Sequence, residues 1–348
     1  MTISTNSSKI LLVKLSSLGD VLHNLPIVWD IRKRFPNAQI DWVVEEGYVH
    51  LLTPLLTNRD FRGIDRIIPF GLRRWKKSIL KRKAWREFFA FKKDLQRVEY
   101  NIIIETQGLL KSAIVCALAK KTSNAVVAGL ANATQYSGYE PLARMFYSQS
   151  VRVPSQCHAV DRSRYIACSA LDLPLIGRAE RVDFYSPTGI HQVGAHEAFG
   201  LKSPYVIFFH STAREAKRWA QSNWITLGQE IAKLGYQIVL PWGSDSEKLI
   251  SQKLALHIPG SIVPQAFSIE EAFSIIERAA LVVGVDTGLA HLAAVLEVPT
   301  VEIYCDSPKW KTEGYWSEKI RNVGDINQPP PMNEVLATSL ELISGVKN

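Results

Sequence analysis

The sequence predicts an α/β protein made of two consecutive domains, each built on a parallel sheet. Short apolar runs alternate with amphipathic stretches of helical length, which is the pattern of βαβ units. The same alternation starts again after residue 200. The chain has 348 residues, a length that usually divides into two domains.

The first half predicts four strands and two clear helices. Apolar runs at 10–13, 40–44, 101–104 and 125–128 predict the strands. The amphipathic stretch 21–35 and the apolar stretch 112–119 predict the helices. Turn residues then mark a linker near 175–200, namely Pro174, Gly177, Pro187 and Gly189.

The second half repeats this alternation of strands and helices. Strands are expected at 205–209, 237–240, 281–285 and 300–304, and helices at 224–234, 246–256, 269–278 and 289–296. The run Gln328-Pro-Pro-Pro331 interrupts the chain before a last helix at 333–343, for which Asn333 is a plausible N-cap. Ligands of open α/β sheets bind beyond the carboxyl ends of the strands, so the loops that follow strands are the candidate sites.

Composition excludes several classes of protein. Hydrophobic residues make up 47% and charged residues 21%, values typical of a folded globular chain. No apolar run reaches the roughly 18–20 residues of a membrane span, and the first residues lack the order of a secretory signal. Cys116, Cys157, Cys168 and Cys305 show no C-x-x-C spacing, so we expect buried free thiols in a reducing cytoplasm.

Charge is divided unevenly between the two halves. Residues 1–170 hold 26 basic and 13 acidic residues, a balance of +13, whereas 171–348 hold 15 basic and 20 acidic residues, a balance of −5. The excess is concentrated in 73–97, where 11 basic residues stand against two acidic ones and five aromatic residues are interleaved. A solvated helix face, a nucleic acid, or an anionic membrane surface would each account for this run.

The loop after the first strand carries Ser16, Ser17, Gly19 and Asp20. It has a single glycine and is therefore not the G-x-G-x-x-G fingerprint of dinucleotide sites. Asp20 alone is most simply read as a helix N-cap. A carboxylate above a cleft can also act as a general base that takes a proton from an attacking hydroxyl.

Two loops of the second half suit a nucleotide. The loop 210–219 combines hydroxyls with cations, and Lys217 could neutralise a leaving phosphate, although a solvated surface loop explains any single lysine. Glu247 follows the next strand and could accept ribose hydroxyl protons. A first-turn glutamate favoured by the helix dipole is an equally good interpretation.

The segment 284–291 is the most informative loop. Asp286-Thr287-Gly288-Leu289 leads into an apolar helix, whose N-terminus offers free N–H groups to an anion. Asp286 as an N-cap is the alternative interpretation. Thr and Gly both have low helix propensity, so their presence in the first turn is better explained by a bound ligand and favours a phosphate site.

Seven segments, taken together, resemble the heptosyltransferase I family of lipopolysaccharide biosynthesis. They are 14–23 (KLSSLGDVLH), 41–47 (DWVVEEG), 68–69 with 73–75 (IP, RRW), 107–112 (QGLLKS), 217–219 (KRW), 240–243 (LPWG) and 285–291 (VDTGLAH). They occur in the family's order along nearly the whole chain. The resemblance implies a GT-B fold, with two Rossmann-like domains facing a central cleft.

The family's domains would correspond to 1–180 for the acceptor, 181–327 for the ADP-sugar, and a C-terminal helix, 328–348, that crosses back to the N-terminal domain. The implied reaction transfers L-glycero-D-manno-heptose from ADP-heptose to Kdo of Kdo2-lipid A with inversion, without metal or other cofactor. The sequence contains no D-x-D triplet. The implied enzyme is cytoplasmic and peripheral to the inner membrane, with no nucleic acid partner.

The resemblance also assigns roles to matching positions. Asp20 corresponds to the catalytic base and Lys217 to the lysine at the phosphates. The implied donor-binding residues are Thr212, Glu247, Phe267, Asp286, Thr287, Gly288, Leu289 and His291. The implied acceptor-binding residues are Ser16, Ser17, Arg73, Arg74, Lys76, Lys77 and Lys111. A polyanionic acceptor would explain why the basic run lies in the first half.

The chain departs from the family at Ala213, where a second threonine is usual, and at Phe267, where methionine is usual. These changes keep open a related inverting transferase with another nucleotide sugar or another lipopolysaccharide acceptor. A polyanion- or membrane-binding protein with a vestigial site is the alternative from a different class. It leaves unexplained why Asp20, Lys217, Glu247 and Asp286 are all present.

Overall fold

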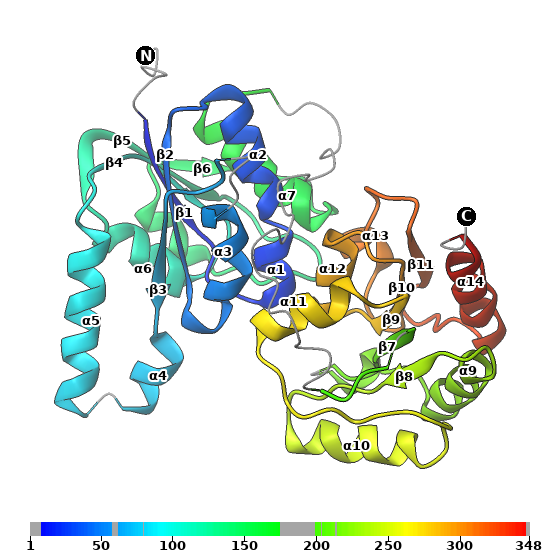
Figure 1. Cartoon of the computed structure of the whole chain (residues 1–348). Helices are drawn as coiled ribbons and strands as arrows, with labels where there is room; N and C mark the ends of the chain where they lie inside the picture. The colour runs from blue at the N-terminus through cyan, green and yellow to red at the C-terminus, as the bar shows by residue number, and fades with distance from the viewer. Residues whose placement is uncertain are drawn as a thin grey trace. The chain divides into compact units, whose positions relative to one another are not determined.

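The computed structural model describes residues 8–57, 62–78, 80–174, 199–202, 204–212 and 214–345. The chain divides into two compact units, Met1–Phe184 and Tyr185–Asn348, and each has its own parallel sheet (Figure 1). Two such domains were predicted. The predicted linker and the predicted boundary at 180–181 fall on 175–198, which lie outside the described residues.

The first unit contains a six-stranded parallel sheet in the order β3-β2-β1-β4-β5-β6, the Rossmann arrangement. The strands are β1 (Lys9–Val13), β2 (Gln39–Glu45), β3 (Arg66–Phe70), β4 (Tyr100–Glu105), β5 (Lys121–Leu130) and β6 (Gln149–Val151). Ile10 of the central strand pairs with Ile40 and Ile102 on either side. Strands covered on both faces read as continuous apolar runs, which is why the central ones were predictable.

The helices of the first unit connect these strands. They are α1 (Leu18–Leu22), α2 (Leu25–Arg34), α3 (Val49–Thr57), α4 (Leu72–Lys77), α5 (Arg82–Leu95), α6 (Leu110–Leu118) and α7 (Ala159–Ala170), with 3₁₀ turns η1 (Glu46–Tyr48) and η2 (Pro141–Phe146). The single helix expected over 21–35 is wrong, because α1 ends at Leu22 and α2 begins at Leu25. Pro26 stands in the first turn of α2, where its missing N–H has no helical partner to lose.

The second unit contains a five-stranded parallel sheet in the order β11-β10-β9-β7-β8. The strands are β7 (Tyr205–Phe209), β8 (Gln237–Val239), β9 (Leu281–Val285), β10 (Thr300–Tyr304) and β11 (Ile320–Gly324). A parallel bridge joins Ile262 to Val239 beyond β8. With this bridge counted as the third strand, the second sheet has the same strand order as the first.

The C-terminal helix belongs to the core of the second unit. The helices here are η3 (Glu215–Lys217), α9 (Gln221–Lys233), α10 (Asp245–Ala255), α11 (Ile269–Glu277), α12 (Gly288–Val295), α13 (Lys309–Thr312) and α14 (Met332–Gly345). Helix α14 packs on α9 and on β9, β10 and β11, and buries Val335, Leu342 and Ile343 there. The expected contact of 328–348 with the first domain stays a prediction.

Candidate active site

Asp20 lies in the loop that leaves the carboxyl end of β1. It is the third residue of α1, and Ser17 is the N-cap, so the N-cap interpretation of Asp20 is wrong. Asp20 Oδ2 accepts hydrogen bonds from Ser17 N at 2.9 Å and Ser17 Oγ at 2.8 Å. Lys14 Nζ lies 3.8 Å from Oδ1, and 45% of the Asp20 side chain is exposed. One carboxylate oxygen is therefore fixed, and the group stays accessible.

The charge state of Asp20 follows from these neighbours. Burial raises the pKa of its carboxyl, but the Lys14 ammonium and the two hydrogen bonds from Ser17 outweigh burial and hold the pKa well below its usual range. Asp20 is a carboxylate at neutral pH. It can take a proton from a hydroxyl that becomes acidic as its oxygen forms a bond.

The loop after β4 supports the loop of Asp20. Gln107 Oε1 accepts hydrogen bonds from Leu15 N at 3.1 Å and Ser16 N at 3.2 Å, and Lys14 Nζ donates to Thr106 O at 3.3 Å. Strands β1 and β4 are the neighbours at which the strand order of the sheet reverses. Ligands of doubly wound sheets bind at this point, so Asp20 stands where a substrate is expected.

Glu45, at the end of β2, gathers three of the predicted acceptor residues. Its Oε2 lies 2.8 Å from Arg73 Nε and its Oε1 lies 3.2 Å from Lys111 Nζ. Lys111 Nζ also donates to Ser16 Oγ at 2.9 Å. Glu45 was not predicted as a site residue. A glutamate that closes a strand buried along most of its length is the sequence signal that could have indicated it.

Three more of the predicted acceptor residues lie on α4, namely Arg74, Lys76 and Lys77, whereas Ser17 is the N-cap of α1. Arg74 pairs with Glu46 at 2.9 Å and also with Glu87, so its charge is already compensated. Lys76 and Lys77 are exposed, and within the described parts of the chain no carboxylate pairs with either. These two lysines are the α4 cations that remain available to an anionic ligand.

Lys217 and Asp286 form an ion pair beyond the carboxyl ends of two neighbouring strands of the second sheet. Lys217 follows β7, Asp286 follows β9, and these two neighbouring strands mark the reversal of strand order in this sheet. Ser307 Oγ donates to the same Asp286 oxygen as Lys217, and Thr312 Oγ1 lies 3.5 Å from the other oxygen. Burial raises the pKa of Asp286, but His291 and Lys217 outweigh it and hold the pKa well below its usual range.

His291 extends this ion pair into the protein core. Its Nε2 lies 3.0 Å from Asp286 Oδ1 and its Nδ1 lies 2.7 Å from Glu302 Oε1. Burial lowers the pKa of His291, but the Glu302 charge and the bonds to both carboxylates outweigh it and raise the pKa to about 10. The ring is therefore an imidazolium that donates from both nitrogens. A hydrogen bond from the His291 ring to the donor would require one of these bonds to break, so its predicted donor-binding role stays a prediction.

The N-terminus of α12 carries the predicted diphosphate-binding residues. Thr287 is the N-cap and the helix begins at Gly288, so Asp286 is not the N-cap. A Cβ on Gly284 of β9 would lie 2.7 Å from Ala290 Cβ, so this glycine permits the close packing of α12 on the strand. Thr287, Gly288 and Leu289 are half-buried, and the free N–H groups of the first turn suit an anion.

The remaining predicted donor residues follow other strands at the same edge of the sheet. Thr212 is half-buried in the loop after β7, and the substituted Ala213 lies outside the described residues. Glu247 is in the first turn of α10, where its Oε2 accepts a hydrogen bond from Gly243 N at 2.7 Å. Phe267 packs edge-on against Phe199 at 6.0 Å.

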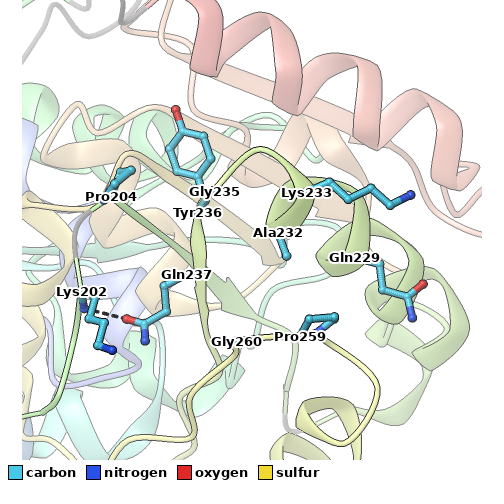
Figure 2. A pocket seen from close by; sticks show the side chains of 10 residues that line it. All are labelled: Lys202, Pro204, Gln229, Ala232, Lys233, Gly235, Tyr236, Gln237, Pro259 and Gly260. Atoms are coloured by element: carbon cyan, nitrogen blue, oxygen red, sulfur yellow. Dashed lines mark hydrogen bonds between the residues drawn. The ribbon is translucent and has the colours of Figure 1, made fainter.

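A cavity of about 670 Å³ in the second unit lies at the opposite edge of the sheet (Figure 2). It is lined by residues that include Lys202, Pro204, Gln229, Tyr236, Gln237 and Pro259. Pro204 and Gln237 stand at the amino ends of β7 and β8. Lys217 and the N-terminus of α12 lie at the carboxyl edge of the sheet. The cavity at the opposite edge is therefore not the candidate site. Among the described residues no group of three or more His, Cys, Asp or Glu is arranged to hold a metal ion.

The family model of Glycosyltransferase family 9 (heptosyltransferase) matches residues 88–340. Lipopolysaccharide heptosyltransferase 1 of Pseudomonas aeruginosa is 35% identical over 325 residues, which cover 92% of this chain and 85% of that protein. The structure of Escherichia coli heptosyltransferase WaaC with ADP is 30% identical, covers 96% of this chain and 99% of its own, and has a TM-score of 0.77. The structure of WaaC with ADP-2-deoxy-2-fluoro heptose is 29% identical, covers 98% and 100%, and has a TM-score of 0.71.

Proposed function

The chain belongs to glycosyltransferase family 9, the heptosyltransferases, with the GT-B fold, and from this premise we propose that it transfers L-glycero-D-manno-heptose from ADP-heptose to Kdo of Kdo2-lipid A. The observation that carries the proposal is the 35% identity to a lipopolysaccharide heptosyltransferase 1 over 92% of the chain. The two clusters at the reversals of strand order support it, because each places charged groups where a substrate binds. The product would be part of the lipopolysaccharide inner core.

On the acceptor side, Asp20 acts as the general base. The hydroxyl oxygen of the acceptor attacks the anomeric carbon of the donor as the bond from that carbon to the phosphate oxygen breaks. The hydroxyl proton passes to Asp20, and the configuration at the anomeric carbon inverts. Ser17 holds one oxygen of Asp20 through two hydrogen bonds, which leaves the other to receive the proton.

On the donor side, Lys217 and the N-terminus of α12 stabilise the negative charge that develops on ADP. Asp286 fixes the Lys217 ammonium, and His291 fixes Asp286, so that the cation is oriented before the donor arrives. We assign leaving-group stabilisation to these protein groups, and propose that the reaction needs no metal ion.

A donor panel at fixed acceptor tests the substrate. With purified protein and Kdo2-lipid A, we expect ADP-heptose to be used much faster than ADP-glucose, UDP-glucose or GDP-mannose. Preferential use of one of the other donors would replace the proposed activity by that of a related inverting transferase. The proposed location is the cytoplasmic face of the inner membrane, where a nucleotide sugar and a lipid-borne acceptor can meet.

A further inference from the structure

Helices α4 and α5 and the turn between them form a hairpin after the carboxyl end of β3 (Figure 1, in cyan). The inner side of α5 is buried against the sheet through Ala84, Phe91 and Leu95. Its outer side carries Trp85 and Phe89, four residues apart and 51% and 57% exposed. These two rings are therefore not needed for the core that α5 already shares with the sheet.

The turn and the inner wall of the hairpin add more apolar surface. Leu80, in the turn, is 96% exposed. Between the helices lies a cavity of about 230 Å³, lined by Leu72, Trp75, Lys76, Ala84, Trp85 and Phe88. Rings run from this cavity to the surface: Phe88 lies 5.8 Å from both Trp75 and Phe89. The rings of Trp75, Phe88, Phe89 and Trp85 thus form one cluster that reaches the surface of the hairpin, and Leu80 adds an exposed aliphatic side chain in the turn.

Cations without carboxylate partners lie along the same hairpin. Arg73, Arg74 and Arg97 are paired with carboxylates. Exposed cations without such a partner within the described ranges are Lys81, Arg82, Lys83, Arg86 and Lys93. On α5, Arg82, Arg86 and Lys93 are adjacent in helical spacing to Trp85 and Phe89.

We propose that the α4–α5 hairpin is a docking surface for an anionic phospholipid bilayer, with Leu80, Trp85 and Phe89 entering the interface and the cations contacting lipid headgroups. Aromatic and aliphatic side chains ringed by lysine and arginine are the composition of interfacial elements. A solvated helix face does not require exposed apolar rings. A nucleic acid could stack on Trp85, but it has no use for a fully exposed leucine or an apolar cavity.

The inference deepens the proposed function. It rests on that function in one respect, namely that the acceptor is a lipid. Arg73, Arg74, Lys76 and Lys77 lie on the same hairpin. Docking of the hairpin would therefore bring the headgroup of a membrane-borne acceptor to the side chains predicted to bind it. Among the described residues, no helix meets the length and hydropathy of a membrane span.

The test measures co-sedimentation of the full-length protein with vesicles of phosphatidylcholine alone or of phosphatidylcholine with phosphatidylglycerol, without donor or acceptor. We expect binding to the anionic vesicles that weakens with salt, and little binding to phosphatidylcholine. Equal partitioning into both vesicles, or into neither, overturns the proposal. This result is independent of any transferase activity.

Variants locate the surface. Lys81→Gln/Arg82→Gln/Lys83→Gln should lower anionic-vesicle partitioning by roughly a hundredfold, because each cation near an anionic surface contributes roughly fivefold. Trp85→Ser/Phe89→Ser should lower it by at least about tenfold. Matched controls remove equal charge or apolar area from the second unit: Lys202→Gln/Lys233→Gln/Lys253→Gln and Leu249→Ser/Leu256→Ser.

Transfer to a deacylated, water-soluble acceptor separates docking from catalysis and checks folding. The hairpin variants should retain this activity while losing vesicle binding, and the controls should retain both. Vesicle binding unchanged in the hairpin variants overturns the assignment of the surface. Loss of transfer to the soluble acceptor in the hairpin variants, with vesicle binding retained, would instead make the hairpin an acceptor contact.

Discussion

Glu302→Gln is expected to turn the imidazolium of His291 into a neutral ring near pH 8. Glu302 Oε1 lies 2.7 Å from His291 Nδ1, and its charge is the largest influence that raises the pKa of His291 to about 10. The amide keeps the shape of the carboxylate but removes the charge. Desolvation lowers the pKa of the buried ring, and in the variant the Glu302 charge that mainly counteracts desolvation is absent.

The magnitude follows from the difference between about 10 and the ordinary value of about 6.5, which corresponds to about 5 kcal/mol between the two protonation states. Because the folded-state pKa is raised, this stabilisation is fully present below about pH 6.5 and is lost as the pH rises through about 10. Asp286 also raises the pKa of His291 and remains in the variant, so these figures set an upper limit: the variant should lack at most about 4 kcal/mol of unfolding free energy at pH 7, and at most about 1 kcal/mol at pH 9.

The assay is urea unfolding of the wild type and the variant at pH 7 and pH 9, together with an NMR titration of the His291 ring. Glu341→Gln, which breaks the exposed pair with Arg321, is the matched control and should cost little at either pH. The reasoning is refuted if Glu302→Gln is equally destabilising at both pH values, or if His291 still titrates near pH 10 in the variant.

Four further predictions concern catalysis. Asp20→Ala should lower kcat at least about a hundredfold with ADP binding nearly unchanged by calorimetry, and near-normal turnover would remove Asp20 from its role. Because Lys14 and Ser17 hold the Asp20 pKa below its usual range, kcat/KM should stay level from about pH 8 down to about pH 5; an acid limb near neutrality that vanishes with Asp20 would contradict this. Lys217→Ala should weaken both turnover and ADP binding, whereas Lys233→Ala on α9 should change neither; unaltered ADP affinity in the first variant would show that the phosphate contact is wrong. Treatment with EDTA should leave the rate unchanged, and loss of activity that Mg²⁺ restores would count against a metal-free mechanism.

The strands that were predictable from the sequence are those buried on both faces. The runs 205–209, 281–285 and 300–304 coincide with β7, β9 and β10, because continuous apolar residues bounded by turns have few other uses. Strand β11 was missed because Arg321 and Asn322 interrupt its apolar residues at the edge of the sheet. Helix α7 was missed for a tertiary reason: it buries Arg164, a charged residue that pairs with Asp30 of α2 at 2.6 Å.

The candidate site was predictable to the level of loops. Asp20, Lys217 and Asp286 were identified because polar residues after parallel strands gather at one edge of the sheet. The ion pair of Lys217 with Asp286 was not foreseen, since the two residues are 69 positions apart and meet only because β7 and β9 are neighbours. Glu302 was also missed, although a charged residue inside the apolar run 300–304 is a readable signal of a buried partner.

Release of ADP from ADP-heptose, measured with and without Kdo2-lipid A, tests the central claim most directly. The proposed in-line displacement requires the acceptor hydroxyl, so we predict rapid release only when the acceptor is present. Release at the same rate without acceptor would show that the donor is hydrolysed instead of transferred. Absence of release under both conditions, with folded protein, would contradict the proposed reaction itself.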